Sequence, residues 1–211
     1  MSAVPTATEA AIVFTDLKDA FAALENARGS PKEVRRAFAR FIELTQKLTS
    51  AMRKDFSRLG KGNWIASSFP AWTSVTELMK YLRNEDQHGD QVFLSVHERR
   101  HFPVPTNLPP GLAVEPGRTF VFEGTWQLDD QLLDSPPEGI TSYEVDPTTG
   151  IPTGREMTLL KIERHYILQA RSPTAAKKIA AAGSVDIHEL ADSALKTLSD
   201  YFEFFRERAD T

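Results

Sequence analysis

Residues 31–57 constrain the fold more than any other stretch, because largely apolar side chains recur there every three or four residues. This stripe consists of Phe38, Phe41, Thr45, Leu48, Met52 and Phe56. Ahead of it, Ser30-Pro31-Lys32-Glu33 places a hydroxyl at the helix cap, proline at the first helical position and glutamate at the third. We therefore expect a long helix over 31–57 that buries one face in a bundle and is broken by Gly60 and Gly62.

Four further segments carry helical spacing or helix boundary signals. They are residues 9–28, 70–88, 173–182 and 186–209. In the first of them the expected buried stripe is Ile12, Val13, Leu17, Phe21 and Leu24. The helix over 70–88 is expected to open at Ser68 and Pro70, with Trp72 on its buried stripe.

The middle of the chain has a different texture, with most of the prolines and glycines falling within 91–155. Short runs rich in β-branched and aromatic residues occur there, at Val92–Val96, Thr119–Phe122 and Ile140–Val145. Residues 156–170 fit either a strand or a helix, and a strand is favoured because a hairpin-like turn precedes them. These patterns predict a small antiparallel sheet.

The expected fold class is α+β and mainly α. The 211 residues are enough for one large domain or two small ones. We expect an up-and-down helical bundle formed by residues 8–88 and 172–211, with a β-rich insertion at 91–170.

Composition excludes several kinds of site. The chain has no cysteine, which excludes disulfides, thiolate zinc sites, iron–sulfur clusters and cysteine nucleophiles. No apolar run approaches the roughly 18 residues of a membrane span, so no membrane partner is expected. The first residues, MSAVPTATEAAIVF, lack a basic stretch before their apolar part and do not resemble a secretion signal. A cytoplasmic protein is expected.

Positive charge is concentrated in one segment of a chain whose formal net charge is −4. Residues 31–61 carry nine basic and three acidic side chains, a balance of +6. Such a surface could attract a polyanion, with Arg53, Lys54, Arg58 and Lys61 as candidate phosphate contacts. The alternative is a solvated helix face, or one that pairs with the acidic segment 109–156.

Residues 83–88, Arg-Asn-Glu-Asp-Gln-His, combine three side chains suited to phosphodiester chemistry at one helix end. His88 titrates near neutral pH and could move a proton to or from a ribose hydroxyl. Arg83 stays charged and could hold a phosphate with two parallel hydrogen bonds. Asn84, four residues before the histidine, would share its helix face and could orient the imidazole. No metal is needed if the ribose 2′-hydroxyl is the nucleophile.

This pattern of Arg83, Asn84, three residues and His88 near the end of a third helix resembles the HEPN superfamily (higher eukaryotes and prokaryotes nucleotide-binding domains). The resemblance covers residues 9–88 and extends to 186–209. It implies a metal-independent endoribonuclease without a cofactor, of the kind found in toxin–antitoxin and phage-defence systems. His88 would be the acid/base, Arg83 would bind phosphate and Asn84 would support both.

The resemblance also implies partners. These are a second copy of the chain that pairs the motifs across a cleft, an RNA substrate, and an antitoxin or nucleotidyltransferase. One branch of the family has a modifiable tyrosine two residues after the histidine, where this chain has Asp90. Many HEPN-like domains are noncatalytic binding or dimerisation modules, and a different helical fold is the third alternative.

A second histidine pattern, His97-Glu98-Arg99-Arg100-His101, matches HExxH letter by letter. As a zinc hydrolase site it would need a helix, so that His97 and His101 face one metal and Glu98 activates water. The flanking residues favour extended chain instead. On a strand the two histidines share a face with Arg99, which could then lie near the path of an RNA. The isolated histidines 165 and 188 are expected at surface or satisfied core positions.

Overall fold

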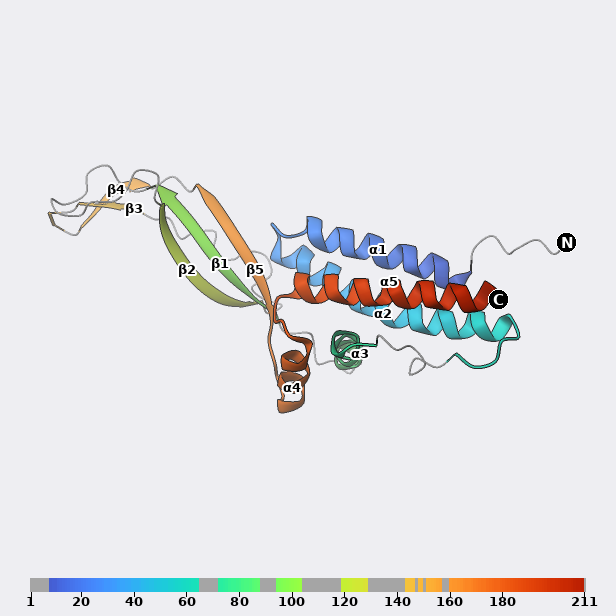
Figure 1. The fold of residues 1–211 in the computed structure, drawn as a ribbon. Coiled ribbons are helices and arrows are strands. Elements are labelled where there is room, and N and C mark those ends of the chain that lie inside the picture. The colour runs from blue at the N-terminus through green and yellow to red at the C-terminus, as the bar shows by residue number, and fades with distance from the viewer. Residues whose placement is uncertain are drawn as a thin grey trace. The chain divides into compact units, whose positions relative to one another are not determined.

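The protein was analysed as a computed structural model that describes residues 8–64, 72–87, 94–103, 119–128, 143–146, 148–149, 151–156 and 160–210. The chain divides into two compact units (Figure 1). We call residues 1–94 and 166–211 the helical unit, and residues 95–165 the strand unit.

The five helices of the described residues all belong to the helical unit. They are α1 (Glu9–Asn26), α2 (Pro31–Arg58), α3 (Ser74–Gln87), α4 (Pro173–Ala182) and α5 (Ile187–Asp210). The helices expected over 9–28, 31–57, 173–182 and 186–209 are confirmed. Their starts follow the expected chemistry, because hydroxyls of Thr8, Ser30 and Ser172 each accept a backbone N–H from three residues further on.

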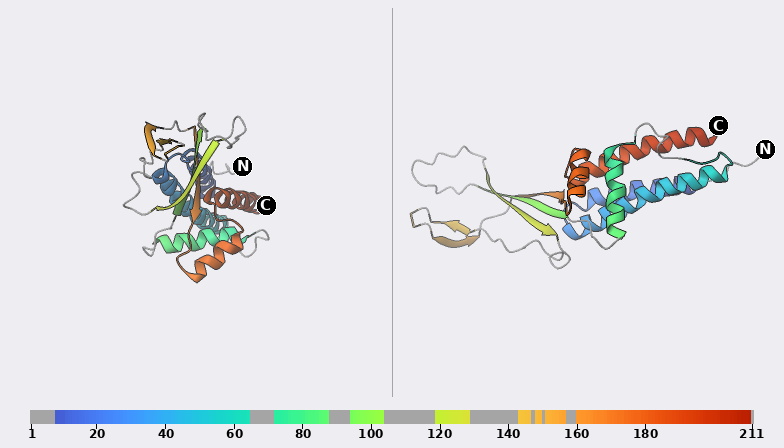
Figure 2. Two further views of the ribbon diagram at one scale, coloured as in Figure 1. Left: turned by 90° about the vertical axis from the view of Figure 1, so that its left-hand side faces the viewer. Right: turned by 90° about the horizontal axis from the view of Figure 1, so that it is seen from below.

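Three long helices lie alongside one another, and α1 runs opposite to the other two (Figures 1 and 2). The start of α1 meets the end of α2, where the Ala10 N–H donates to Asp55 Oδ2 at 2.8 Å. The C-terminal ends of α2 and α5 lie next to each other, with the centroids of the Phe56 and Phe205 rings 6.3 Å apart. The core between the helices includes Leu17, Leu24, Phe38, Phe41, Ile42, Leu48, Met52, Leu78, Leu198, Tyr201 and Phe205.

The third helix does not follow the up-and-down pattern. Figures 1 and 2 show α3 crossing α2 and α5 rather than running beside them. It also begins later than expected, because Thr73 and Thr76 cap it. The Thr76 hydroxyl accepts from the Thr73 N–H at 3.1 Å and donates to the Thr73 carbonyl at 2.7 Å. Trp72 therefore precedes the helix, and Ser68 and Pro70 lie outside the described residues.

The stripe expected on α1 is only partly buried. Leu17 and Leu24 are in the core, whereas the Ile12 side chain is 54% exposed. The buried face is completed by Ala10 and Ala20, because these positions, with 17 and 24, follow the spacing of the side that meets α2 and α5. Ile12 is about 200° around the helix from Ala10, so it lies on the opposite side and stays exposed.

The described residues form five strands, which lie in or next to the strand unit. They are β1 (Leu94–Pro103), β2 (Thr119–Leu128), β3 (Tyr143–Val145), β4 (Pro152–Glu156) and β5 (Lys161–Leu168). One sheet has the order β2-β1-β5, and a second pairs β3 with β4 in antiparallel register, Tyr143 opposite Glu156. The extended interpretation of residues 156–170 is confirmed for 161–168. A mainly helical α+β chain with a small antiparallel sheet is thus confirmed.

None of the helices within the described ranges is both long enough and apolar enough to cross a bilayer.

Candidate functional site

The C-terminal part of α3 carries two of the three residues that the sequence singled out for phosphodiester chemistry. Arg83 is half-buried and Asn84 is exposed. The helix ends at Gln87, so His88 and Asp90 lie outside the described residues. A cation is favoured at this end of a helix, because the helix dipole places partial negative charge there.

Burial leaves one donor of Arg83 unsatisfied. Its Nε atom is buried and has no hydrogen-bond partner among the described residues. Met79, one turn earlier, and Leu82, directly before Arg83, are both buried in the core. A buried donor without a partner costs about 1–3 kcal/mol, and an anionic acceptor at Nε would recover that energy. Guanidinium groups bind phosphate oxygens well because their N–H groups form a planar fork.

Two of the expected RNA contacts on α2 are already paired with α1. Lys54 Nζ lies 3.1 Å from Glu9 Oε1, and Arg58 Nη1 lies 3.3 Å from Glu9 Oε2. Glu9 is in the first turn of α1, where the helix dipole also favours its charge. The pairing supports the alternative of a solvated face for these two cations, although their acidic partner is on α1 rather than in 109–156.

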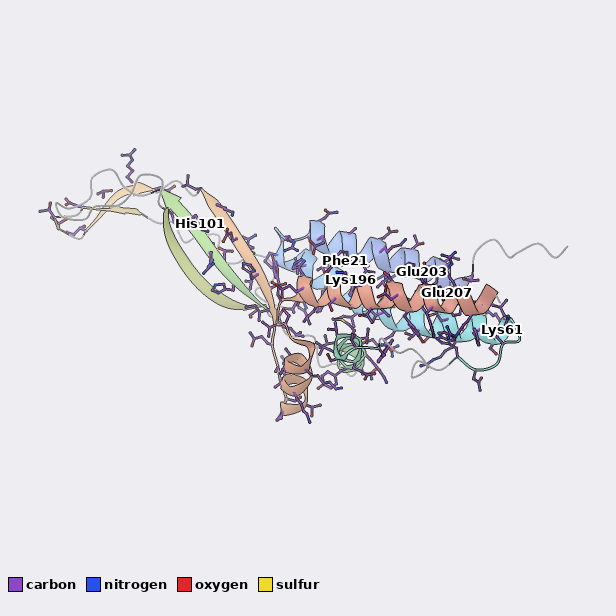
Figure 3. All side chains as sticks on the ribbon, viewed as in Figure 1. Phe21, Lys61, His101, Lys196, Glu203 and Glu207 are labelled. Atoms are coloured by element: carbon purple, nitrogen blue, oxygen red, sulfur yellow. The ribbon has the colours of Figure 1, made fainter. Side chains whose placement is uncertain are left out.

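The remaining expected RNA contacts belong to two different units of the chain. Arg53 and Lys61 are exposed near the C-terminal end of α2, and Figure 3 labels Lys61 just beyond that end. The crossing helix α3 meets α2 nearer its other end (Figures 1 and 2). Arg99 is exposed on β1, in the strand unit.

The HExxH stretch forms a strand, as its flanks indicated. Residues 97–101 lie within β1, so the helical geometry that the zinc alternative requires is not formed. Side chains alternate instead. Glu98 and Arg100 are buried, whereas Arg99 is exposed and both histidines are half-exposed. The described residues hold no group of three potential ligand side chains close enough to bind a metal ion.

Glu98 is the centre of a buried charge cluster in the strand unit. Its Oε1 accepts a hydrogen bond from Arg100 Nε, and its Oε2 accepts one from Arg164 Nε on β5 at 2.8 Å. Burial acts to raise the pKa of Glu98, but the hydrogen bonds from Arg164 and Arg100 outweigh it and hold the pKa below its usual value. In the zinc hydrolase alternative Glu98 would activate water. In the structure its carboxylate is held between two guanidinium groups.

The structure reveals one polar cluster that the sequence analysis missed. We call His188, Glu25 and Arg28 the imidazole cluster. His188 Nδ1 lies 2.8 Å from Glu25 Oε1, and the same carboxylate accepts from Arg28 Nε and Nη2 at 2.6–3.1 Å. The His188 side chain is 4% exposed, and its Nε2 is buried with no hydrogen-bond partner among the described residues. His188 is therefore a core histidine as one of the expected alternatives proposed, but only its Nδ1 atom has a hydrogen-bond partner among the described residues.

The carboxylate of the imidazole cluster stays ionised. Burial acts to raise the pKa of Glu25, but hydrogen bonds from Arg28 and His188 lower it overall. An ionised carboxylate can only accept, so Nδ1 of His188 carries the hydrogen. Glu25 and His188 are 163 residues apart, and no local spacing could have joined them.

Searches against protein-family models, curated proteins and solved structures found no match for this chain.

Proposed function

We propose that the chain is a metal-independent endoribonuclease of HEPN type that binds a phosphodiester at the C-terminal end of α3. Arg83 binds the phosphate, His88 is the acid/base and Asn84 supports both. The observation that supports the proposal is the buried Arg83 Nε, which has no hydrogen-bond partner among the described residues. A phosphate oxygen is the acceptor that matches this donor in charge and geometry.

The chemistry follows from these groups without a metal. The ribose 2′-oxygen attacks the adjacent phosphorus, the bond from phosphorus to the 5′-oxygen breaks, and a 2′,3′-cyclic phosphate remains. One proton leaves the 2′-hydroxyl and one reaches the departing 5′-oxygen, which is work for an imidazole that titrates near neutral pH. The guanidinium stabilises the extra negative charge on phosphorus. Two copies in a homodimer would bring two such motifs to one cleft, in the setting of toxin–antitoxin or phage defence.

The test is to incubate the purified full chain with mixed RNA in the presence of a chelator. We expect RNA ends with 2′,3′-cyclic phosphates, no cleavage of DNA, and loss of cleavage in His88→Ala and Arg83→Ala. Arg206→Ala is the matched control, because Arg206 is an exposed arginine on α5 that pairs with Glu203. Circular dichroism checks that each variant stays helical. Absence of cleavage, or cleavage that His88→Ala leaves unchanged, refutes the proposal.

A noncatalytic HEPN-like module is the second candidate, and the pairing of Lys54 and Arg58 with Glu9 favours it. These cations are partly neutralised, so the surface is less suited to a polyanion than its composition indicates. A chain that dimerises in sedimentation experiments but cleaves no RNA would support this candidate.

A further inference from the structure

A cavity lies between the N-terminal half of α1 and the C-terminal half of α5. Its volume is about 440 Å³, and the residues used below are Ala11, Phe14, Lys18, Phe202, Phe205 and Arg206. Figure 3 labels Glu203 on this stretch of α5, beside α1. We call the cavity the α1–α5 groove. Small-molecule sites in proteins commonly fall between roughly 300 and 1,000 Å³, so the groove is large enough for a small ligand.

Aromatic rings form the apolar part of the α1–α5 groove. Phe14 of α1 stacks on Phe202 of α5, with ring centroids 4.4 Å apart and planes 22° apart. Phe202 is in turn 6.2 Å from Phe205. Phe202 and Phe205 are fixed by burial, whereas Phe14 is half-exposed. Alanines at 11 and 209 occupy little of the space. The groove therefore presents a rigid apolar surface to an apolar ligand body.

Most polar groups of the groove are already engaged. The Thr8 hydroxyl accepts from the Ala11 N–H, and the Thr15 hydroxyl donates to the Ala11 carbonyl at 3.1 Å. Arg206 pairs with Glu203 at 3.1 Å. The rings of Phe14, Phe202 and Phe205 offer no hydrogen-bonding group, so the part of a ligand that lies against them must be mainly apolar.

Lys18 supplies the unmatched charge. Its Nζ lies 5.0 Å from the centroid of the Phe14 ring, and it makes no ion pair with a carboxylate of the residues that the structure describes. Lys18 is exposed, so its ammonium attracts an anion only modestly and the neighbouring rings must supply the rest of the binding free energy. Charge complementarity therefore selects a ligand with one negative group next to its apolar body.

We propose that the α1–α5 groove binds an amphiphilic monoanion, with the apolar body on Phe14, Phe202 and Phe205 and the anionic head on Lys18. The proposal is independent of the ribonuclease proposal, since it uses no residue of α3.

The test uses decanoate as the anionic probe and decyltrimethylammonium, with the same chain length and opposite charge, as its counterpart. Calorimetric titration of the full chain, below the micelle concentration of each probe, should show one decanoate per chain and weaker binding of the cation. Lys18→Gln should weaken decanoate binding by roughly two- to fivefold, the range for one ion pair at an exposed position. Lys18→Arg should retain the affinity.

Two further variants separate the groove from general charge effects. Ala209→Trp fills the groove and should abolish decanoate binding while helix content by circular dichroism stays unchanged. Lys196→Gln removes an exposed lysine of α5 that does not line the groove (Figure 3) and should leave binding unchanged.

The proposal is overturned if decanoate does not bind, or if neither Lys18→Gln nor Ala209→Trp weakens its binding. It is also overturned if the groove is covered by a second copy of the chain. In that case sedimentation would show a dimer that Ala209→Trp dissociates, with no decanoate bound to either form.

Discussion

His188 Nδ1 lies 2.8 Å from Glu25 Oε1, and this contact joins the first turn of α5 to the last turn of α1. The backbone around the contact is also tied, because the Tyr166 hydroxyl donates to the Arg28 carbonyl at 2.8 Å. The Tyr166 ring lies 5.9 Å from the imidazole and closes one side of the cluster. The antiparallel pairing of α1 with α5 is thus held at one end by polar contacts and at the other by the stacked Phe14 and Phe202 rings.

Glu25→Gln should lower the free energy of unfolding by about 1 kcal/mol. The amide keeps an acceptor for His188 but loses the charge that binds Arg28, and a charged hydrogen bond contributes more than a neutral one. Urea unfolding at neutral pH measures the change. Glu203→Gln, which breaks an exposed pair with Arg206, should change stability by less than about 0.5 kcal/mol. Equal effects of the two substitutions would contradict a special role for Glu25.

Acid should destabilise the helical unit through the same carboxylate. The pKa of Glu25 in the folded chain lies below its usual value of 4.5, so the unfolded chain takes up the proton first as the pH falls. The stabilisation is therefore complete above about pH 5 and decreases as the pH falls through the folded pKa. Urea midpoints measured between about pH 6 and pH 3 should decrease less in Glu25→Gln than in the unmodified chain. If the urea midpoints of both proteins decrease equally, protonation of Glu25 does not cause the loss of stability in acid.

Asp55→Ala should cost about 1–3 kcal/mol, because the buried carboxylate accepts the Ala10 N–H at the start of α1. This N–H has no partner within its own helix, as is usual for the first turn. Asp55→Asn keeps an acceptor oxygen and should lose less. Urea unfolding compares the two variants. If both have the stability of the unmodified chain, the bond between α1 and α2 contributes nothing measurable.

Gly183→Ala should destabilise the end of α4 by about 1–2 kcal/mol, because φ at this residue is +82° and a Cβ is disfavoured in that region. Gly29→Ala is the matched control. An added Cβ would meet no atom within 4 Å at either position, but Gly29 is not among the glycines with positive φ. Its substitution should be neutral or stabilising by up to about 1 kcal/mol. Thermal unfolding of both variants distinguishes backbone strain from crowding.

Glu98→Gln should destabilise the strand unit strongly. The substitution leaves the buried Arg100 and the half-buried Arg164 without the carboxylate between them, and breaking a buried ion pair from one side costs about 3–5 kcal/mol. Hydrogen exchange of the β1 and β5 amides should accelerate. Lys161→Gln, which removes an exposed lysine that pairs with Glu163 on its own strand, should leave that exchange nearly unchanged. Slow exchange in Glu98→Gln would mean that the cluster does not hold these strands together.

Local patterns were sufficient for most of the secondary structure. The stripe over 31–57 and the capping hydroxyls identified four helices to within two residues at each end, because spacing and capping depend on neighbours in sequence. The strand containing the HExxH letters was also identified from its flanks. The predicted start of α3 at residue 70 was wrong. Thr73 and Thr76 cap the helix, so it begins at Ser74.

The sequence by itself determined where most of the helices form and which face of α2 is apolar, because hydrogen bonds within a helix join residues only about four positions apart. Only the tertiary structure decided that Glu25 meets His188, that Asp55 binds the start of α1, and that α3 crosses its neighbours. Ile12 and Leu17 are both apolar, yet packing against α2 and α5 buries only Leu17. Burial and long-range pairing depend on how separate elements pack against one another. The spacing of residues along the sequence does not show which elements will be in contact.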